Sequence, residues 1–129
     1  MDNEGAKKIA ERFVRVVETN DPSDVFAEDV FCDINVPEWR FQMQGADAIA
    51  RWLGGEQPDG CTVPSWRADA TEHGVIVEVV QQLGDEIARN IHRLDVRDGK
   101  IVEWTMYCSG VWSKETQETQ RREAPMFRP

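Results

Sequence analysis

The chain contains little of what several common protein classes require. Its three cysteines, Cys32, Cys61 and Cys108, are odd in number and widely spaced, which favours reduced thiols over a disulfide framework or a zinc site. No apolar run approaches the roughly 20 residues that a membrane span needs. The N-terminal segment, MDNEGAKK, has no hydrophobic signal region, so the expected location is the cytoplasm.

Basic side chains are also scarce. The chain has 15 Lys and Arg against 24 Asp and Glu, a formal net charge of -9 at pH 7. Nucleic-acid binding draws its affinity from Lys and Arg gathered against phosphates, and here the basic residues are scattered. DNA, RNA and anionic membranes are therefore not expected partners, and we expect no cofactor.

The remaining composition is that of one globular domain. A chain of 129 residues suits a single domain over residues 1–129, and 30% charged residues favour a soluble fold over a disordered one. No repeat, low-complexity tract or interdomain linker interrupts it.

Apolar spacing predicts three helices in the first half of the chain. Apolar residues recur at helical spacing from Ala6 to Val17, which predicts an amphipathic helix ending near Asn20. Residues 21–26 predict a short second helix, because Pro22 suits a first turn. A third helix is expected over residues 45–53. The tail from Ser113 is polar and compatible with a helix.

The second half of the chain is predicted to form mainly strands. After a first strand over residues 30–36, strands are expected at 65–71, 74–83 and within 87–112. Helices followed by antiparallel strands predict an α+β domain in which one sheet face packs on the helices.

The Asp98-Gly99 turn sets the faces of the last hairpin. A three-residue loop would pair His92 with Trp104 and place alternate side chains on one apolar face. That face would hold Asn90, His92, Leu94, Val96, Val102, Trp104, Met106 and Cys108. Because side chains alternate along a strand, this prediction depends on the register.

In the order of these predicted elements, the chain resembles the nuclear transport factor 2-like, or SnoaL-like, superfamily. The segments that carry the resemblance are residues 27–30, 45–49 and 98–101, together with Trp104. Their order covers nearly the whole chain. The resemblance implies N-terminal helices on a strongly curved, mixed but mainly antiparallel sheet, forming a cone with an internal pocket.

The superfamily includes isomerases, cyclases, dehydratases, epoxide hydrolases and noncatalytic binders, so the fold alone does not set the function. His92 falls near the position of the isomerases' oxyanion-stabilising acid, whereas their catalytic base matches Ile34. The catalytic positions of the epoxide hydrolases fall near Val80, Gln82 and Met106. Neither catalytic set is present. The outer sheet face of such proteins often forms a two-fold dimer, so we expect a homodimer.

The candidate site centres on His92. If residues 84–86 form a three-residue loop, Glu78 lies directly opposite His92, where a carboxylate would raise the pKa of the imidazole and favour general acid–base chemistry. The predicted catalytic set is His92, Glu78, Asn90 and Asn35. The predicted substrate-binding set is Trp39, Trp104, Met106, Cys108 and Gln82.

Other interpretations stay open. His92 could be a hydrogen-bonded structural residue, and Glu78 could face solvent if Val75, Val77 and Val79 form the buried face instead. The favoured function is a cofactor-independent isomerase, cyclase or dehydratase acting on an apolar cyclic or polyketide-like substrate. The alternatives are a noncatalytic protein that binds a small apolar molecule and a purely dimeric scaffold.

Overall fold

The computed structural model describes residues 1–55 and 60–128, which form three helices and six strands. The helices are α1 (Asn3–Thr19), α2 (Ala46–Gly55) and α3 (Lys114–Glu123). The strands are β1 (Phe26–Asn35), β2 (Arg40–Gln44), β3 (Thr62–Ala70), β4 (Gly74–Leu83), β5 (Glu86–Arg97) and β6 (Lys100–Trp112).

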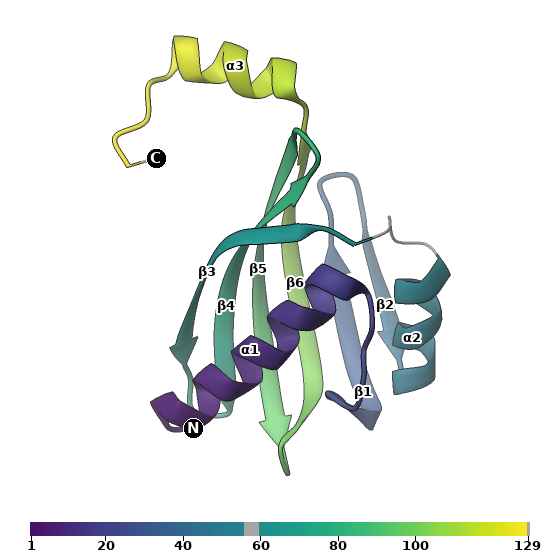
Figure 1. The fold of residues 1–129 in the computed structure, drawn as a ribbon. Coiled ribbons are helices and arrows are strands. Elements are labelled where there is room, and N and C mark those ends of the chain that lie inside the picture. Colours follow the sequence, from purple (N-terminus) through teal and green to yellow (C-terminus); the bar gives the residue numbers. More distant parts are fainter. Residues whose placement is uncertain (56–59, 129) are drawn as a thin grey trace.

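All six strands form one mixed sheet in the order β2-β1-β6-β5-β4-β3. Among the strand pairs of the described residues, the β1–β6 pair alone is parallel. Helices α1 and α2 lie on the same face of the sheet (Figure 1), which we call the inner face; the opposite face is the outer face. The predicted α+β class is confirmed. The sheet is open, with β2 and β3 at opposite edges, and is not strongly curled, so the predicted cone and internal pocket are not confirmed.

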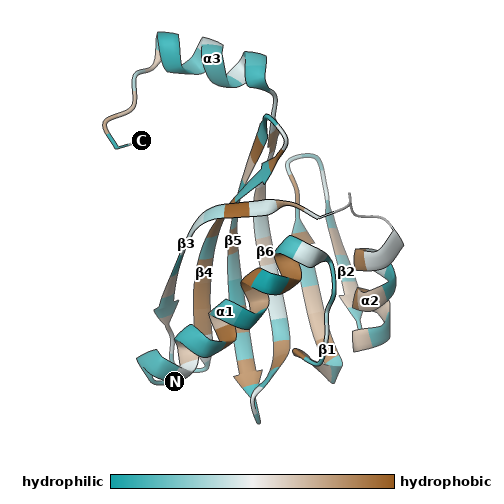
Figure 2. Cartoon of the chain, viewed as in Figure 1, coloured by the Kyte–Doolittle hydropathy of each residue, from teal (hydrophilic) through white to brown (hydrophobic). Residues whose placement is uncertain are grey.

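Helix α1 begins and ends where its capping residues place it. The Asp2 carboxylate accepts a hydrogen bond from the Gly5 N–H at 2.7 Å, and Asn20 adopts a left-handed conformation with φ of 59°. The apolar side of α1 is buried against the inner face, where hydrophobic residues follow the strands (Figure 2). The buried residues of α1 are Ala6, Ile9, Ala10, Phe13, Val14 and Val16.

One prediction for the segment between α1 and α2 is wrong, and one strand in it was not predicted. No short helix forms at residues 21–26: Ser23 has a φ of 49°, which a right-handed helix cannot continue, and its N–H bonds the Asp21 carboxylate at 2.9 Å. Strand β1 starts directly afterwards at Phe26. The short edge strand β2 was not predicted; it pairs antiparallel with β1 from Gln44 to Arg40.

The β5–β6 hairpin has the predicted inward face except next to the turn, where Ile101 is buried in place of Val102, and its register differs. Asp98 and Gly99 both have positive φ, 53° and 75°, and form a two-residue turn instead of a three-residue loop. A bulge on β6 then leaves Val102 unpaired, so His92 pairs with Met106 and not with Trp104. Because the two changes add up to two residues, His92 still faces inward.

Helix α3 confirms the helical prediction for the tail, but none of its side chains is buried. The helix leads away from the end of the sheet (Figure 1). None of the described helices combines the length and apolar character required to cross a membrane.

Candidate functional site

His92 is a buried imidazole at the centre of the inner face. Its side chain lies on β5 and only 1% of the residue is exposed. The ring packs edge-on against Phe13 of α1, with centroids 4.7 Å apart. The indole Nε1–H of Trp104 donates a hydrogen bond to His92 Nδ1 at 3.0 Å. Nδ1 is therefore the acceptor, which assigns the proton of the neutral ring to Nε2.

The second ring nitrogen of His92 has no hydrogen-bond partner among the described residues. Nε2 is buried, so its N–H lacks both solvent and protein acceptors. A buried donor left in this way costs about 1–3 kcal/mol. Burial also lowers the pKa of His92 from 6.5 to about 3. The ring is therefore neutral at physiological pH and offers one fixed hydrogen-bond donor.

The predicted Glu78–His92 pair does not form. Gly84 and Asp85 make a two-residue turn, so Leu83 pairs with Glu86, and Val77 instead of Glu78 lies opposite His92. A strand reverses its faces when the register moves by one residue. The alternative in which Val75, Val77 and Val79 form the buried face is confirmed.

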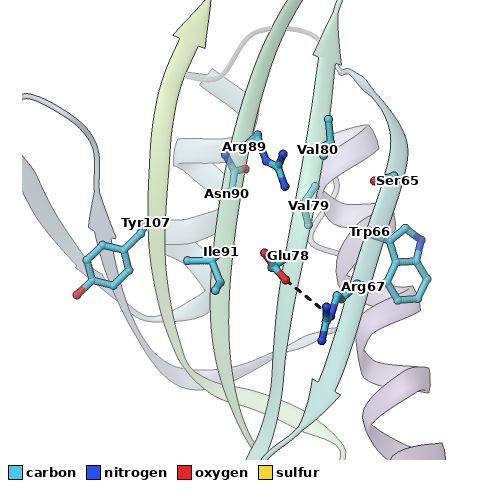
Figure 3. Close-up of a pocket in the computed structure, with 10 residues that line it drawn as sticks. All are labelled: Ser65, Trp66, Arg67, Glu78, Val79, Val80, Arg89, Asn90, Ile91 and Tyr107. Carbon is cyan, nitrogen blue, oxygen red and sulfur yellow. Dashed lines mark ion pairs between the residues drawn. The ribbon is translucent and has the colours of Figure 1, made fainter. Parts of the chain in front are cut away.

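Glu78 consequently points to the outer face. Its Oε2 lies 3.8 Å from Nε of Arg67 on the neighbouring strand, as Figure 3 shows. The expectation that a carboxylate raises the pKa of His92 is therefore wrong, since burial without a charged partner lowers it.

Asn90 does share the inner face with His92, as predicted. It is 6% exposed, and its Nδ2 donates to Sγ of Cys108 at 3.2 Å. The backbone N–H of Gly110 reaches the same sulfur at 3.3 Å. This second bond arises because the strand bulges at residues 109–110, where Gly110 has a φ of 81°. Cys108 is half-buried between these two donors.

Asn35 lies on the other side of the sheet from His92. It shares the outer face with Asp33, and its Nδ2 donates to the Met106 carbonyl at 3.1 Å. Arg40 binds Asp33 through two bonds of 2.9 and 2.7 Å, and this bonding lowers the pKa of the Asp33 carboxyl. The structure thus brings together two of the four predicted catalytic residues, His92 and Asn90.

The predicted substrate-binding residues divide in the same way. Trp104 and Met106 are buried beside His92, and Cys108 lies beside Asn90. Trp39 is 76% exposed in the β1–β2 connection. Gln82 is exposed and donates to the Gly84 carbonyl at 3.1 Å, because the one-residue change of register turns it outward.

The sequence reasoning missed the aromatic cluster around Trp104. Its indole contacts Phe13, Phe26 and Trp52, with ring centroids 5.3, 5.5 and 6.1 Å apart. Phe13 could have been found from its place on the apolar side of the first predicted helix. Phe26 could not, because it was assigned to a helix that does not form.

A second missed feature is the amide–thiol contact at one end of the inner face. Gln81 of β4 donates to Sγ of Cys61 at 3.5 Å, and this thiol donates to the Val17 carbonyl of α1 at 3.4 Å. Gln81, Cys61 and Cys108 are all half-buried, so polar groups reach the surface at this end.

Two surface hollows lie elsewhere, and His92 lines neither. The larger one, of about 500 Å³, crosses the outer face of β3 to β6, and we call it the outer-face hollow (Figure 3). The side chains that line it from the outer face are both polar and apolar: Ser65, Arg67, Glu78, Val80, Arg89, Ile91 and Tyr107. The other, of about 430 Å³, lies between the start of α1 and β3.

Solved structures resemble this arrangement over most of its length. A nuclear transport factor 2-like protein of unknown function from Burkholderia xenovorans is 19% identical, with a TM-score of 0.66 over 91% of this chain and 92% of that one. The chain has the nuclear transport factor 2-like fold. A similar protein from Anabaena variabilis is 20% identical, with a TM-score of 0.61 over 85% of this chain and 93% of that one.

A third structure adds a bound molecule. A protein with a ketosteroid isomerase-like fold from Catenulispora acidiphila, in complex with trimethylamine, is 17% identical to the chain. Its TM-score is 0.63, over 79% of this chain and 85% of that one. No model of a known family matches the sequence, and no curated protein does.

Proposed function

We propose that the protein binds an apolar small molecule on the inner side of its sheet. In this proposal His92 donates a hydrogen bond from Nε2 to an acceptor atom of the ligand, such as a carbonyl oxygen. The observation that carries the proposal is the buried Nε2–H without a partner. A ligand acceptor would recover the free energy that this donor loses by burial.

The surroundings of His92 support an uncharged, flat ligand. Phe13, Trp104 and Met106 supply apolar and aromatic surface, and His92 and Asn90 are the only polar residues that are buried in the described part of the chain. A charged ligand would find no compensating charge there. We propose access from the end of the sheet where Gln81, Cys61 and Cys108 are half-buried.

Matched ligand pairs would test this proposal. A series of cyclic ketones and the hydrocarbons of the same shape would be titrated against the protein, with Trp fluorescence and the ring ¹⁵N shifts of His92 as readouts. We expect each ketone to bind about tenfold more tightly than its hydrocarbon, which corresponds to about 1.4 kcal/mol for one hydrogen bond.

The preference should vanish in His92→Phe and persist in the control His73→Gln. His73 is an exposed residue whose side chain is 73% accessible. Equal affinity for ketones and hydrocarbons in the unmodified protein would refute the proposal.

A cofactor-independent isomerase, cyclase or dehydratase is the second candidate. The observation in its favour is that a neutral imidazole with a fixed N–H can stabilise a developing enolate oxygen. Against it, no buried carboxylate lies on the described inner face to act as a base. Exchange of the α-protons of the same ketones in D₂O would separate the two: an enzyme accelerates the exchange and loses this activity in His92→Phe, while a binder leaves the rate unchanged.

We also propose a homodimer formed through the outer face. Ile91 is 42%, Tyr107 58% and Trp112 39% exposed on this face, among charged residues of both signs such as Arg89 and Glu78. Such a patch suits a self-complementary two-fold contact, in which a basic residue of one copy meets an acidic residue of the other. Sedimentation over a range of concentrations measures it.

A further inference from the structure

No side chain of the C-terminal arm, residues 113–128, is buried. Gln117 joins helix α3 to the body through two hydrogen bonds, to the carbonyls of Asp85 and Trp112, each 3.0 Å long. In Figure 2 this helix is almost entirely hydrophilic. A helix of ten residues with no apolar side is marginal in water by itself.

The tip of the C-terminal arm has the opposite character. Met126 is 60% exposed and Phe127 is wholly exposed. Two consecutive large apolar side chains that are exposed beyond a polar helix are typical of a segment that is buried against another protein surface. The polar helix then acts as a spacer of about 15 Å that carries this tip away from the sheet.

The tip cannot reach the outer-face hollow of its own copy while α3 keeps its place. Helix α3 runs across the end of the sheet and not back along it (Figure 1). From Trp112, Tyr107 in the hollow lies five residues back along β6, or about 16 Å. The four residues from Glu123 to Phe127 span at most about 14 Å, and the length of α3 adds a sideways offset.

Charge favours another copy as the partner of the arm. Residues 119–129 carry three arginines and one glutamate, whereas residues 1–118 carry 12 basic and 23 acidic side chains. The whole arm carries four basic and three acidic side chains, so its positive charge is concentrated toward the tip, which the acidic body of a second copy attracts. The hollow itself is lined by two basic side chains, Arg67 and Arg89, and one acidic side chain, Glu78, so its apolar surface and not its charge would receive the tip.

We propose that the two copies of the homodimer exchange C-terminal arms, with Phe127 of each copy seated in the outer-face hollow of the other. This inference rests on the proposed homodimer. Ile91, Val80 and Tyr107 supply the apolar surface for the ring. Two facing sheets pack about 10 Å apart, and a hollow of about 500 Å³ between them would stay unfilled without a side chain from the arm.

Disulfide trapping between differently tagged copies tests the exchange. One copy carries Phe127→Cys and the other Ile91→Cys, and the mixture is oxidised mildly. We expect a disulfide-linked species that contains both tags. Phe127→Cys mixed with the unmodified chain is the first control, and Phe127→Cys mixed with Lys8→Cys, on the exposed side of α1, is the second; neither should form this species.

Dimer dissociation provides a readout without cysteines. Each dimer holds two such rings, so Phe127→Ser should raise the dissociation constant about 900-fold, about 30-fold for each buried aromatic ring that is lost, while Phe127→Leu should change it less than about tenfold. A stable dimer that is insensitive to Phe127→Ser and gives no mixed disulfide would overturn the exchange and leave the homodimer standing. A monomer at every concentration would overturn both, and a disulfide confined to one chain in the double variant would show an arm folded on its own copy.

Discussion

Trp104 and His92 are joined by a buried hydrogen bond of 3.0 Å from the indole Nε1–H to the imidazole Nδ1. The two residues lie on adjacent strands, and both side chains face α1. Because the indole can only donate, it excludes a proton from Nδ1 and assigns it to Nε2. The bond therefore decides that His92 presents a donor, and not an acceptor, to its surroundings.

The stability of the protein should fall as the pH decreases from 6.5 to 5. The pKa of His92 is about 3 in the folded protein and close to 6.5 in the unfolded chain, so the unfolded state takes up the proton first. The linkage predicts a loss approaching about 1.4 kcal/mol in the free energy of unfolding for each pH unit below 6.5. Denaturant titrations at pH 7, 6 and 5 measure it.

The same titrations on two variants test whether His92 causes this decrease of the free energy of unfolding with falling pH. His92→Phe should lack it, and His73→Gln, which changes an exposed imidazole, should keep it. The window ends near pH 5 because Asp24 and Asp33, whose pKa values are lowered by basic neighbours, contribute a loss of the same sign in more acidic solution. An equal slope in His92→Phe would contradict the assignment.

Trp104→Phe should destabilise the protein by about 1–3 kcal/mol. The variant keeps an aromatic ring against Phe13 and Phe26 but leaves Nδ1 of the buried His92 without a donor. Thermal and denaturant unfolding measure the loss, and the ring ¹⁵N shifts of His92 report whether the proton still occupies Nε2 alone. Trp39→Phe is the matched control, since Trp39 is 76% exposed, and it should stay within about 0.5 kcal/mol of the unmodified protein.

The sequence predicts the inward face of β5 correctly because the alternation there is unbroken. Ala88, Asn90, His92 and Leu94 are all buried. The loop at Asp98-Gly99 is one residue shorter than predicted, and the bulge at Val102 shifts the pairing by one residue more. The total shift is two residues, so the inward side chains of β5 still face inward. Face predictions survive errors of two residues and fail at errors of one.

The predicted pairing of Glu78 with His92 failed because the register there differs by one residue. Gly84-Asp85-Glu86 is compatible with a loop of two or three residues, and local sequence does not choose between them. The shorter turn moved Glu78 and Gln82 to the outer face together. The short strand β2 was missed because its five residues carry only Phe41 and Met43 as an apolar signal. Contacts with Trp52 and the pairing with β1 stabilise it, and neither is local in sequence.

Glu78→Gln should leave ligand binding on the inner side unchanged. The side chain is 47% exposed on the outer face, and it forms an ion pair with Arg67 at 3.8 Å. An exposed ion pair of this kind contributes about 0–1 kcal/mol, so unfolding should change little. Ketone titrations of Glu78→Gln beside His92→Phe check this, and a loss of affinity in Glu78→Gln as large as that in His92→Phe would place Glu78 in the site after all.

Gly74→Ala should destabilise the start of β4 by about 2 kcal/mol or more, while Gly54→Ala should not. A Cβ at Gly74 would collide with the carbonyl oxygen of Leu94 on the paired strand, a backbone atom that cannot move without breaking the β4–β5 ladder. Overpacking of this kind typically costs about 1–3 kcal/mol in the free energy of unfolding. The Cβ would lie unusually close to the Leu94 oxygen, so we expect a loss in the upper part of this range. At Gly54, in α2, a Cβ meets nothing within 4 Å, so alanine should stabilise the helix by up to about 1 kcal/mol. Urea unfolding of both variants measures the difference, and equal effects would mean that β4 and β5 are farther apart at Gly74 than their pairing indicates.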